Sequence, residues 1–594
     1  MKYRLFLVFA AALLFSSAIG ANAQFGKNKV QYQEFDWKYI ESKHFDVYFH
    51  SDAKYLAEFT ALNAEEALPK IERILGYKLS KRVSIVVYNS QNEFQQTNII
   101  SSFLPEGVGG VTELMKNRVV LPFFGSYAQL RHVTHHELIH AVMNDMYYGG
   151  SIQTAVYSGN LANLPLWISE GLAEWSSLGQ LDFETDIFMR DLFMGPNPPG
   201  LMDLDGYYAY RGGQAFYWYV DRVYGEEKIT ELLNRIKITR SVDLAFRGCF
   251  QLSLEEFSEK WVADMKKFYF PDIAKFQAPE DYAIRVTNHE KLRNFYNTSP
   301  AISPDGSRMV YIADKEGLFR IFLLDLEKTG KEPPTPKLLI SSFRSQDFED
   351  LNMLTPGLSW SPDGKKIAIS AKAGENDAIF IVDPNTSDYD KLDLGIKSIS
   401  SVAWSYDGDK IAFIGIQDQQ TDIFIYNIQS KQVTRLTNDV FTDNSPIWSH
   451  DNKTIYFISD RDSITRPGMT KDIFRIWKHD VSLSDVFSLD VGTGNISRIT
   501  NSGAYNKTSL AISDDDKKLL FVSDKNGIGN IYELNLATRI ERPKTNSISG
   551  ITQISLSPDS RVLLFSSLRN SGYDVFKIRN QFDKKLPGDT LPNT

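Results

Sequence analysis

The sequence predicts a multidomain protein in which an α+β unit is followed by an all-β array of six similar repeats. Two observations lead to this prediction. Helical and strand-like segments are mixed up to about residue 277, whereas a short turn motif with flanking strands recurs six times beyond about residue 298. A chain of 594 residues has room for about four ordinary domains, or fewer when one is a large repeat array.

Composition and charge are those of a globular protein. Apolar residues make up 42% of the chain and charged residues 23%, which argues against extensive disorder. The net charge is −9 and there is no long basic run, so nucleic acid is not an expected partner. Cys249 is the single cysteine, which excludes an intramolecular disulfide, and we interpret it as a small buried apolar residue.

Residues 1–23 have the pattern of a signal peptide. Lys2 and Arg4 are followed by an apolar stretch over residues 5–19 and by Ala21-Asn22-Ala23, an A-x-A cleavage site. The apolar stretch is short for a membrane span, so an uncleaved N-terminal anchor is the less favoured alternative. We expect an exported protein, periplasmic or secreted, that begins near Gln24 and has no membrane span.

The first unit, residues 24–277, contains segments with the apolar spacing of strands and segments with the apolar spacing of helices. Apolar residues recur every second position in its predicted strands and at helical spacing in its predicted helices. Pro165 suits the first turn of a helix, and Gly149-Gly150 suits the end of one. The predicted strands are residues 45–49, 83–88 and 118–122, and the predicted helices are residues 53–75 and 129–146, one after Pro165, and several over 214–267.

The second unit is built from a repeat with a fixed turn. Each copy has a Ser-x-Asp turn, closed by Gly in three of the six copies, followed by two apolar strands, which is typical of a β-hairpin. Successive turn aspartates are 58, 44, 44, 64 and 44 residues apart, a period that fits one four-stranded propeller blade with insertions in two blades. We expect these aspartates to form turns: Asp305, Asp363, Asp407, Asp451, Asp515 and Asp559.

Six copies predict a six-bladed β-propeller over residues 278–580, with a tail at 581–594. The last copy lacks an outer strand, and residues 284–288 match the outer strands of other blades, so we expect them to complete the sixth blade. The repeats resemble the WD40-like (PD40) repeats of TolB-type propellers. Trp360, Trp404 and Trp448 of the repeats are expected to pack in the core rather than to bind a ligand.

A candidate metal site lies in the first unit. His136-Glu137-Leu138-Ile139-His140 is an H-E-x-x-H motif, which on a helix places both imidazoles on one face beside the glutamate. A catalytic zinc needs a third protein ligand, and Glu170 on a second predicted helix is the candidate. Glu174, one turn further on, either fixes the tautomer of a ligand histidine or is a plain surface charge.

These two segments together resemble the gluzincin metallopeptidases of the peptidase MA-like group. In that group the third zinc ligand is the Glu of an E-G-x-A motif on a following helix, and Glu170 stands at that position. The resemblance implies a zincin-like peptidase domain over residues 24–277, with Zn²⁺ as its cofactor. Residues 118–122 look like the edge strand that lines the substrate, and residues 210–216 resemble the Tyr/Gly-rich helix start of this group.

The chemistry assigns a role to each residue of the motif. Zinc would activate a water molecule, and Glu137 would act as the general base that takes its proton. A second donor to the oxyanion is needed. Tyr207, Tyr208 and Tyr210 are candidates among which the sequence does not choose, and Tyr210 is the working assignment. The remaining histidines of the segment, His132 and His135, are expected beside the site or in solvent rather than as ligands.

The leading hypothesis is an exported zinc peptidase that hydrolyses peptide bonds. Its substrate would be a peptide or a protein, and its propeller would engage the substrate or a protein partner. The alternative is a non-catalytic periplasmic scaffold whose zinc site is vestigial. The intact H-E-x-x-H motif together with Glu170 favours the enzyme.

Overall fold

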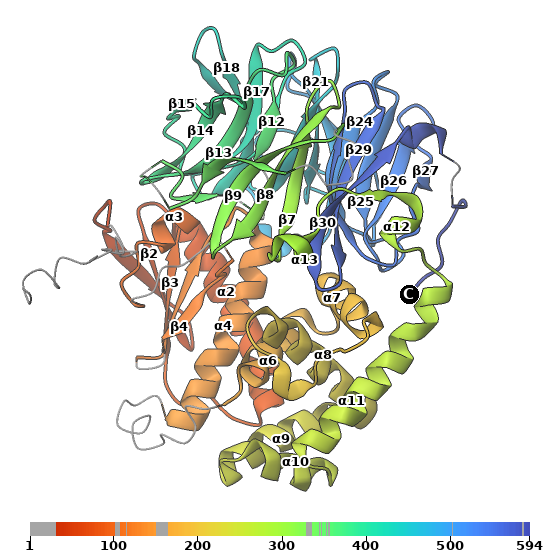
Figure 1. Cartoon of the computed structure of the whole chain (residues 1–594). Helices are drawn as coiled ribbons and strands as arrows, with labels where there is room; N and C mark the ends of the chain where they lie inside the picture. Colours follow the sequence, from red (N-terminus) through yellow and green to blue (C-terminus); the bar gives the residue numbers. More distant parts are fainter. Residues whose placement is uncertain are drawn as a thin grey trace, which may run out of the picture.

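The computed structural model describes most of the chain from residue 31 onward, as a helix-rich N-terminal unit beneath a β-propeller (Figure 1). The predicted signal peptide, residues 1–23, lies outside the described residues. The description covers residues 31–100, 107–113, 116–149, 164–327 and 335–594, except 344, 346, 352, 354–356, 502 and 585–586.

The N-terminal unit contains one five-stranded mixed sheet, in the order β1-β2-β3-β5-β4. Its strands are β1 (Trp37–Glu41), β2 (Phe45–His50), β3 (Val83–Tyr88), β4 (Val111–Glu113) and β5 (Arg118–Pro122). The three predicted strands are present, but the prediction that residues 118–122 form an edge strand is wrong. β5 pairs in parallel with β3 and antiparallel with β4, so the short strand β4 is the edge.

Helices cover the sheet and continue into a bundle below the propeller (Figure 1). α4 is longer than predicted at both ends: Ser126 caps its first turn by accepting a hydrogen bond from the backbone N–H of Gln129, and Gly149 ends it in the left-handed conformation. The main helices are α2 (Lys54–Leu75), α4 (Tyr127–Tyr148), α6 (Leu166–Leu178), α7 (Phe183–Met194), α8 (Tyr207–Tyr224), α9 (Glu226–Thr239), α10 (Val242–Phe250) and α11 (Leu254–Tyr269). A four-residue helix, α3 (Gln91–Phe94), follows β3.

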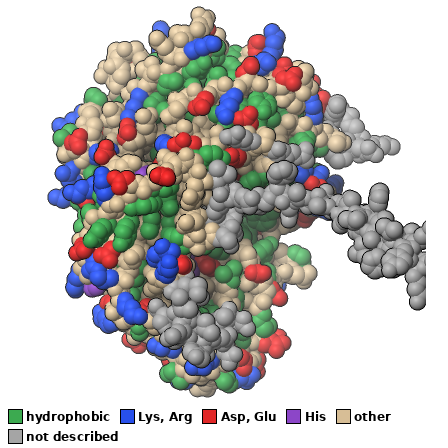
Figure 2. Space-filling view, turned by 90° about the vertical axis from the view of Figure 1, so that its left-hand side faces the viewer, with side chains coloured by type: hydrophobic (Ala, Val, Ile, Leu, Met, Phe, Trp, Pro, Cys, Tyr) green, Lys and Arg blue, Asp and Glu red, His purple; other side chains and the backbone are tan. Residues whose placement is uncertain are grey.

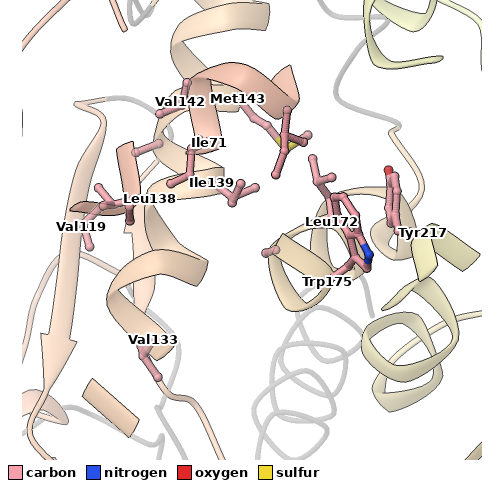
Figure 3. Close-up of a cluster of buried hydrophobic side chains, with 14 of the residues drawn as sticks. Ile71, Val119, Val133, Leu138, Ile139, Val142, Met143, Leu172, Trp175 and Tyr217 are labelled. Carbon is pink, nitrogen blue, oxygen red and sulfur yellow. The ribbon is translucent and has the colours of Figure 1, made fainter. Parts of the chain in front are cut away.

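Apolar side chains hold α4 between the sheet and the bundle (Figure 3). Leu138 of α4 faces Val119 of β5, and both are fully buried. Ile139, on the other side of the helix, packs in the same core. Since α4 is buried on two sides, the remaining stripe of the helix, which carries the histidines, has a fixed direction.

Two glycines allow α6 and α8 to approach closely. A Cβ atom on Gly171 would lie 2.3 Å from the backbone of Gly213, and one on Gly213 would lie 2.3 Å from the carbonyl oxygen of Trp167. The Tyr217 hydroxyl donates a hydrogen bond to the Ile168 carbonyl at 3.0 Å across the same contact. The glycine of the E-G-x-A segment therefore serves helix packing.

The C-terminal unit is a six-bladed propeller, as the repeats predicted. Six antiparallel sheets follow one another along the chain, and the described strands of the blades run from β7 (Asn297–Ile302) to β30 (Gly572–Arg579). In every repeat the turn aspartate accepts hydrogen bonds from the turn serine and from a backbone N–H two residues on, which confirms its turn-forming role. The indole N–H groups of Trp360 and Trp448 donate to backbone carbonyls of the preceding blade.

Strand β6 (Ile284–Arg285) closes the ring, as predicted from the orphan segment 284–288. It pairs antiparallel with β30, the third strand of the sixth blade. Asp574 of β30 is fully buried and accepts hydrogen bonds from Arg285, the Thr287 hydroxyl and the His289 backbone N–H. The Asp574 carboxylate thus joins the first segment of the propeller, residues 284–289, to its last strand, β30.

An insertion in blade 4 joins the two units. It accounts for the 64-residue spacing and runs from about residue 460 to 484, where β22 (Asp485–Asp490) begins. Tyr55 of α2 donates a hydrogen bond to the Phe474 carbonyl at 3.0 Å, and its hydroxyl accepts one from the Ile476 N–H at 2.8 Å. Ile476 and Val481 are buried in the same apolar core as α2 and α4. The propeller and the N-terminal unit thus share a core.

The surface carries charges of both signs. On the face shown in Figure 2, Lys and Arg side chains alternate with Asp and Glu over both units. Among the described residues, no helix has the length and apolar character that crossing a membrane requires.

We predict that Asp574→Ala lowers the free energy of unfolding by about 3–5 kcal/mol, because it leaves the half-buried Arg285 and the buried Thr287 and His289 without the acceptor they share. Urea titration followed by tryptophan fluorescence measures this loss. Asp514→Ala, at an exposed position of a blade turn, is the control and should change stability by less than about 0.5 kcal/mol. A loss below about 1 kcal/mol for Asp574→Ala would contradict the role assigned to this carboxylate.

Candidate metal centre

Three atoms from two helices converge at one point of the N-terminal unit. His136 and His140 lie one turn apart on α4, and Glu170 lies on α6. The Nε2 atoms of the two histidines are 3.2 Å apart, and each is 3.2 Å from Oε2 of Glu170. The structure therefore brings together the three residues that the sequence predicted as metal ligands.

The spacing of these atoms fits a zinc ion. Zinc in proteins has bonds of about 2.0–2.2 Å to histidine nitrogen and carboxylate oxygen, in a tetrahedral arrangement that separates neighbouring ligand atoms by about 3.3–3.5 Å. The observed separations of 3.2 Å are close to this value. Two imidazoles and one carboxylate also form a donor set that zinc accepts, with a fourth position left for water.

Glu174 supports the centre from the far side of His136. Its Oε1 lies 2.9 Å from Nδ1 of His136 and 3.6 Å from Nε2 of His132. Glu174 is buried, so the surface-charge alternative is wrong, and its position suits an acceptor for the ring N–H of a ligand histidine. His132 on α4 and Glu174 on α6 thus face each other one helical turn away from the centre. Neither is one of the three converging ligands.

The electrostatics of the centre favour a cation. Burial lowers the pKa of His136, but its hydrogen bonds to Glu170 and Glu174 and the charge of Glu137 outweigh this and raise it to about 10. Burial raises the pKa of Glu170, but the neighbouring His140 and His136 bring it well below its usual value. The raised pKa of His136 reflects the three carboxylates around it, a concentration of negative charge that a divalent ion would balance.

Arg211 of α8 also carries a positive charge close to Glu174. Its Nη1 lies 3.8 Å from Glu174 Oε2, and its Nε donates a hydrogen bond to the Tyr207 hydroxyl at 3.0 Å. Arg211 also pairs with Glu184 of α7, so its charge is shared among carboxylates. Sequence reasoning did not single out Arg211, because nothing in its local pattern shows that α8 returns to α6 at this point.

Glu137 is held on the sheet side of the centre. It is 5% exposed, and its Oε2 accepts a hydrogen bond of 2.6 Å from the hydroxyl of Thr112 on β4. A Cβ atom on the neighbouring Gly110 would come within 3.1 Å of Glu137 Oε1. Thr112 and Gly110 are further residues that the sequence analysis missed.

The structure separates the three tyrosine candidates. The Tyr210 ring lies parallel to the His136 ring, with centroids 6.2 Å apart. Burial raises the pKa of Tyr210, and the carboxylates of Glu170 and Glu137 raise it further. Tyr207 is instead engaged by Arg211, and Tyr208 packs against Phe188. Of the three, Tyr210 is the one beside the converging ligands.

His135 points away from the centre. Its Nε2 lies 2.9 Å from the Ser176 hydroxyl on α6, and burial lowers the pKa of its imidazole to about 3. It is therefore a half-buried neutral histidine that joins α4 to α6, as the expectation that it is no ligand implies.

A further group of possible ligands, in the propeller, is already paired with arginines. Oxygen atoms of Asp422, Asp439 and Asp443 lie within 4.8 Å of one another. Arg461, which is fully buried, pairs with Asp439 and Asp443, and Arg435 pairs with Asp422. This cluster acts as an internal ion-pair network between blades 3 and 4.

The propeller matches a known family. The family model described as the TolB beta propeller domain covers residues 342–574, which is less than half of the chain and lies outside the N-terminal unit. Together with the six sheets, this match confirms the TolB-like propeller predicted from the repeats. No curated protein matches the chain.

Among solved structures, a putative TolB from Agrobacterium tumefaciens is 21% identical, with a TM-score of 0.34; the similarity covers 48% of this chain and 90% of that one. TolB from Acinetobacter baumannii is 17% identical, with a TM-score of 0.33; the similarity covers 56% of this chain and 71% of that one. An oligogalacturonate lyase from Vibrio parahaemolyticus is 12% identical, with a TM-score of 0.31; the similarity covers 51% of this chain and 92% of that one.

We predict that Glu174→Ala weakens zinc binding by about 10- to 100-fold, because His136 loses the carboxylate that orients its ring. Competition with a chromophoric chelator measures the affinity. Glu184→Ala is the matched control, since Glu184 also pairs with Arg211 but does not touch His136. Equal affinities for the two variants would show that Glu174 does not support the centre.

Proposed function

We propose that this protein is a zinc-dependent peptidase that hydrolyses peptide bonds in peptide or protein substrates. The observation that carries the proposal is the convergence of His136 Nε2, His140 Nε2 and Glu170 Oε2 at mutual distances of 3.2 Å, beside a buried glutamate. This donor set and the following E-G-x-A segment support a gluzincin-type, zincin-like domain for residues 24–277.

The residues around the centre suit the chemistry of amide hydrolysis. When bound by His136, His140 and Glu170, zinc would polarise the scissile carbonyl and acidify water. Glu137 would accept a proton from the attacking water at its carboxylate and return it to the leaving amine. Tyr210, with its pKa raised by burial and by carboxylates, keeps its proton at neutral pH and could donate a hydrogen bond to the oxyanion.

The propeller would engage the substrate or a protein partner. Its position supports this role, because α4 begins against blade 3: the Tyr127 hydroxyl donates a hydrogen bond to the Gln419 carbonyl at 3.2 Å. The metal-site helix and the propeller are thus adjacent. The alternative, a non-catalytic scaffold with a vestigial zinc site, has the same fold and differs only in whether substrate is turned over.

We predict that Glu137→Gln retains zinc but lowers the rate of peptide cleavage by about 100- to 10,000-fold, because the general base is lost. Elemental analysis gives the zinc content, and mass spectrometry of a digested peptide library gives the cleavage rate. Glu170→Ala should lose zinc itself. Glu66→Gln, at an exposed position of α2, is the control and should change neither quantity.

The two hypotheses give different results in this assay. One zinc per wild-type chain without cleavage of any peptide would favour the scaffold. Full zinc occupancy in Glu170→Ala would show that another residue is the third ligand.

We further propose that the protein is exported, to the periplasm or beyond, after cleavage behind Ala23. The support is the sequence pattern of residues 1–23, in which Ala21 and Ala23 occupy the small-residue positions of the cleavage site. No helix among the described residues argues for a membrane span.

We predict that Ala23→Asp blocks this processing, because a charged side chain does not fit the small-residue position. Intact-mass measurement on the full-length chain produced in a bacterium should give an N-terminus at Gln24 for the wild type and an unprocessed chain for the variant. Ala11→Leu, inside the apolar stretch, should be processed normally. A wild-type protein that retains Met1 would contradict export by this route.

A further inference from the structure

We propose that Thr112 is a positioning residue for Glu137, and that its hydroxyl holds one carboxylate oxygen, Oε2, so that the other, Oε1, is left for the reacting proton. This inference rests on the proposed function, because it assigns Thr112 a role in the same site. It adds a residue from the sheet edge to a centre that is otherwise built from helices.

The geometry is specific to the Thr112 hydroxyl. Its oxygen lies 2.6 Å from the Glu137 carboxylate atom Oε2 and 3.0 Å from the Glu137 backbone carbonyl oxygen. Both contacts go to one residue, and Glu137 is 5% exposed. Inside such a site the water that could replace a lost hydrogen bond has little room, so the hydroxyl matters more than it would at the surface.

A hydroxyl group has one proton and two lone pairs, and it can rotate. While Glu137 is a carboxylate, the Thr112 hydroxyl donates its proton to Oε2. With Oε2 engaged in this way, Oε1 is the carboxylate oxygen that remains to accept a proton.

The sheet register explains why Thr112 faces the helix. Thr112 pairs with Val119 across the antiparallel strands β4 and β5. Side chains of directly opposed residues lie on the same side of a sheet. Val119 faces Leu138 of α4 (Figure 3), so Thr112 presents its hydroxyl to the same helix one residue earlier, at Glu137.

Gly110 leaves room for the other side of the carboxylate. A Cβ atom at this position would lie 2.9 Å from Glu137 Cγ and 3.1 Å from Oε1. The chain therefore lies close to Glu137 at two positions, at Gly110, where no side chain fills the space, and at the Thr112 hydroxyl on the edge strand. The Thr112 hydrogen bond restricts the rotation of the carboxylate, with Oε2 bound to Thr112 and Oε1 left for the reacting proton.

The test compares Thr112→Val, which keeps the shape and removes the hydroxyl, with Thr112→Ser, which keeps the hydroxyl. We expect Thr112→Val to lower kcat by about 10- to 100-fold, the effect of losing one hydrogen bond to a charged group, with KM within about twofold. Zinc content should stay at the wild-type level. Thr112→Ser should restore kcat to within about threefold of the wild type.

Crystal structures of the zinc-loaded variants give a readout that does not depend on activity. We expect Glu137 Oε2 to stay within hydrogen-bond distance of residue 112 in the wild type and Thr112→Ser, and to turn away in Thr112→Val. Thr134→Val is the control, because the Thr134 hydroxyl lies on α4 close in sequence to Glu137 but donates to the Leu130 carbonyl of its own helix. It should leave kcat and the position of Glu137 unchanged.

The outcomes separate this inference from the proposed function. A kcat within twofold of the wild type in Thr112→Val, or an unmoved Glu137 carboxylate in its crystal structure, would overturn the role of Thr112. A wild-type protein that binds zinc and cleaves nothing would overturn the proposed function, while the crystal structures would still decide whether Thr112 holds Glu137.

Discussion

The structure of the N-terminal unit depends on the distance between α4 and α6. Two imidazoles from one helix and a carboxylate from the other meet at 3.2 Å, a separation that tolerates little relative movement of the two helices. α4 is fixed by apolar packing on the sheet side, and α6 is fixed by its close contact with α8 through Gly171 and Gly213. The glycines near the site are thus part of its geometry, because larger residues would displace the carboxylate.

Much of this arrangement could be predicted because its determinants are local in sequence. His136 and His140 are four residues apart, and helical geometry alone places them on one face. The propeller could be predicted equally well from the repeats, since each blade folds from strands adjacent in sequence and each turn has its own serine and aspartate. The orphan segment at 284–288 was recognised by its likeness to the outer strands, although its partner strand β30 lies almost 300 residues away.

The parts that could not be predicted depend on contacts between distant segments. Thr112 lies on a three-residue strand with no periodicity, and only the register with β5 brings it to Glu137. The same short strand displaced residues 118–122 from the sheet edge. Arg211 reaches Glu174 because α8 packs on α6, which the sequence of neither helix shows. In each case the chain supplies an ordinary polar residue, and tertiary structure gives it a specific partner.

The insertion of blade 4 limits how the two units can move. Its residues Ile476 and Val481 are buried among the helices that carry the proposed site, and burying a large apolar side chain contributes about 1.5–3 kcal/mol. Swinging the propeller outward as a rigid body would expose these side chains to water. For the proposed peptidase, entry of a peptide chain would require less free energy through local displacement of backbone around the centre than through hinged opening, and the two units should unfold together.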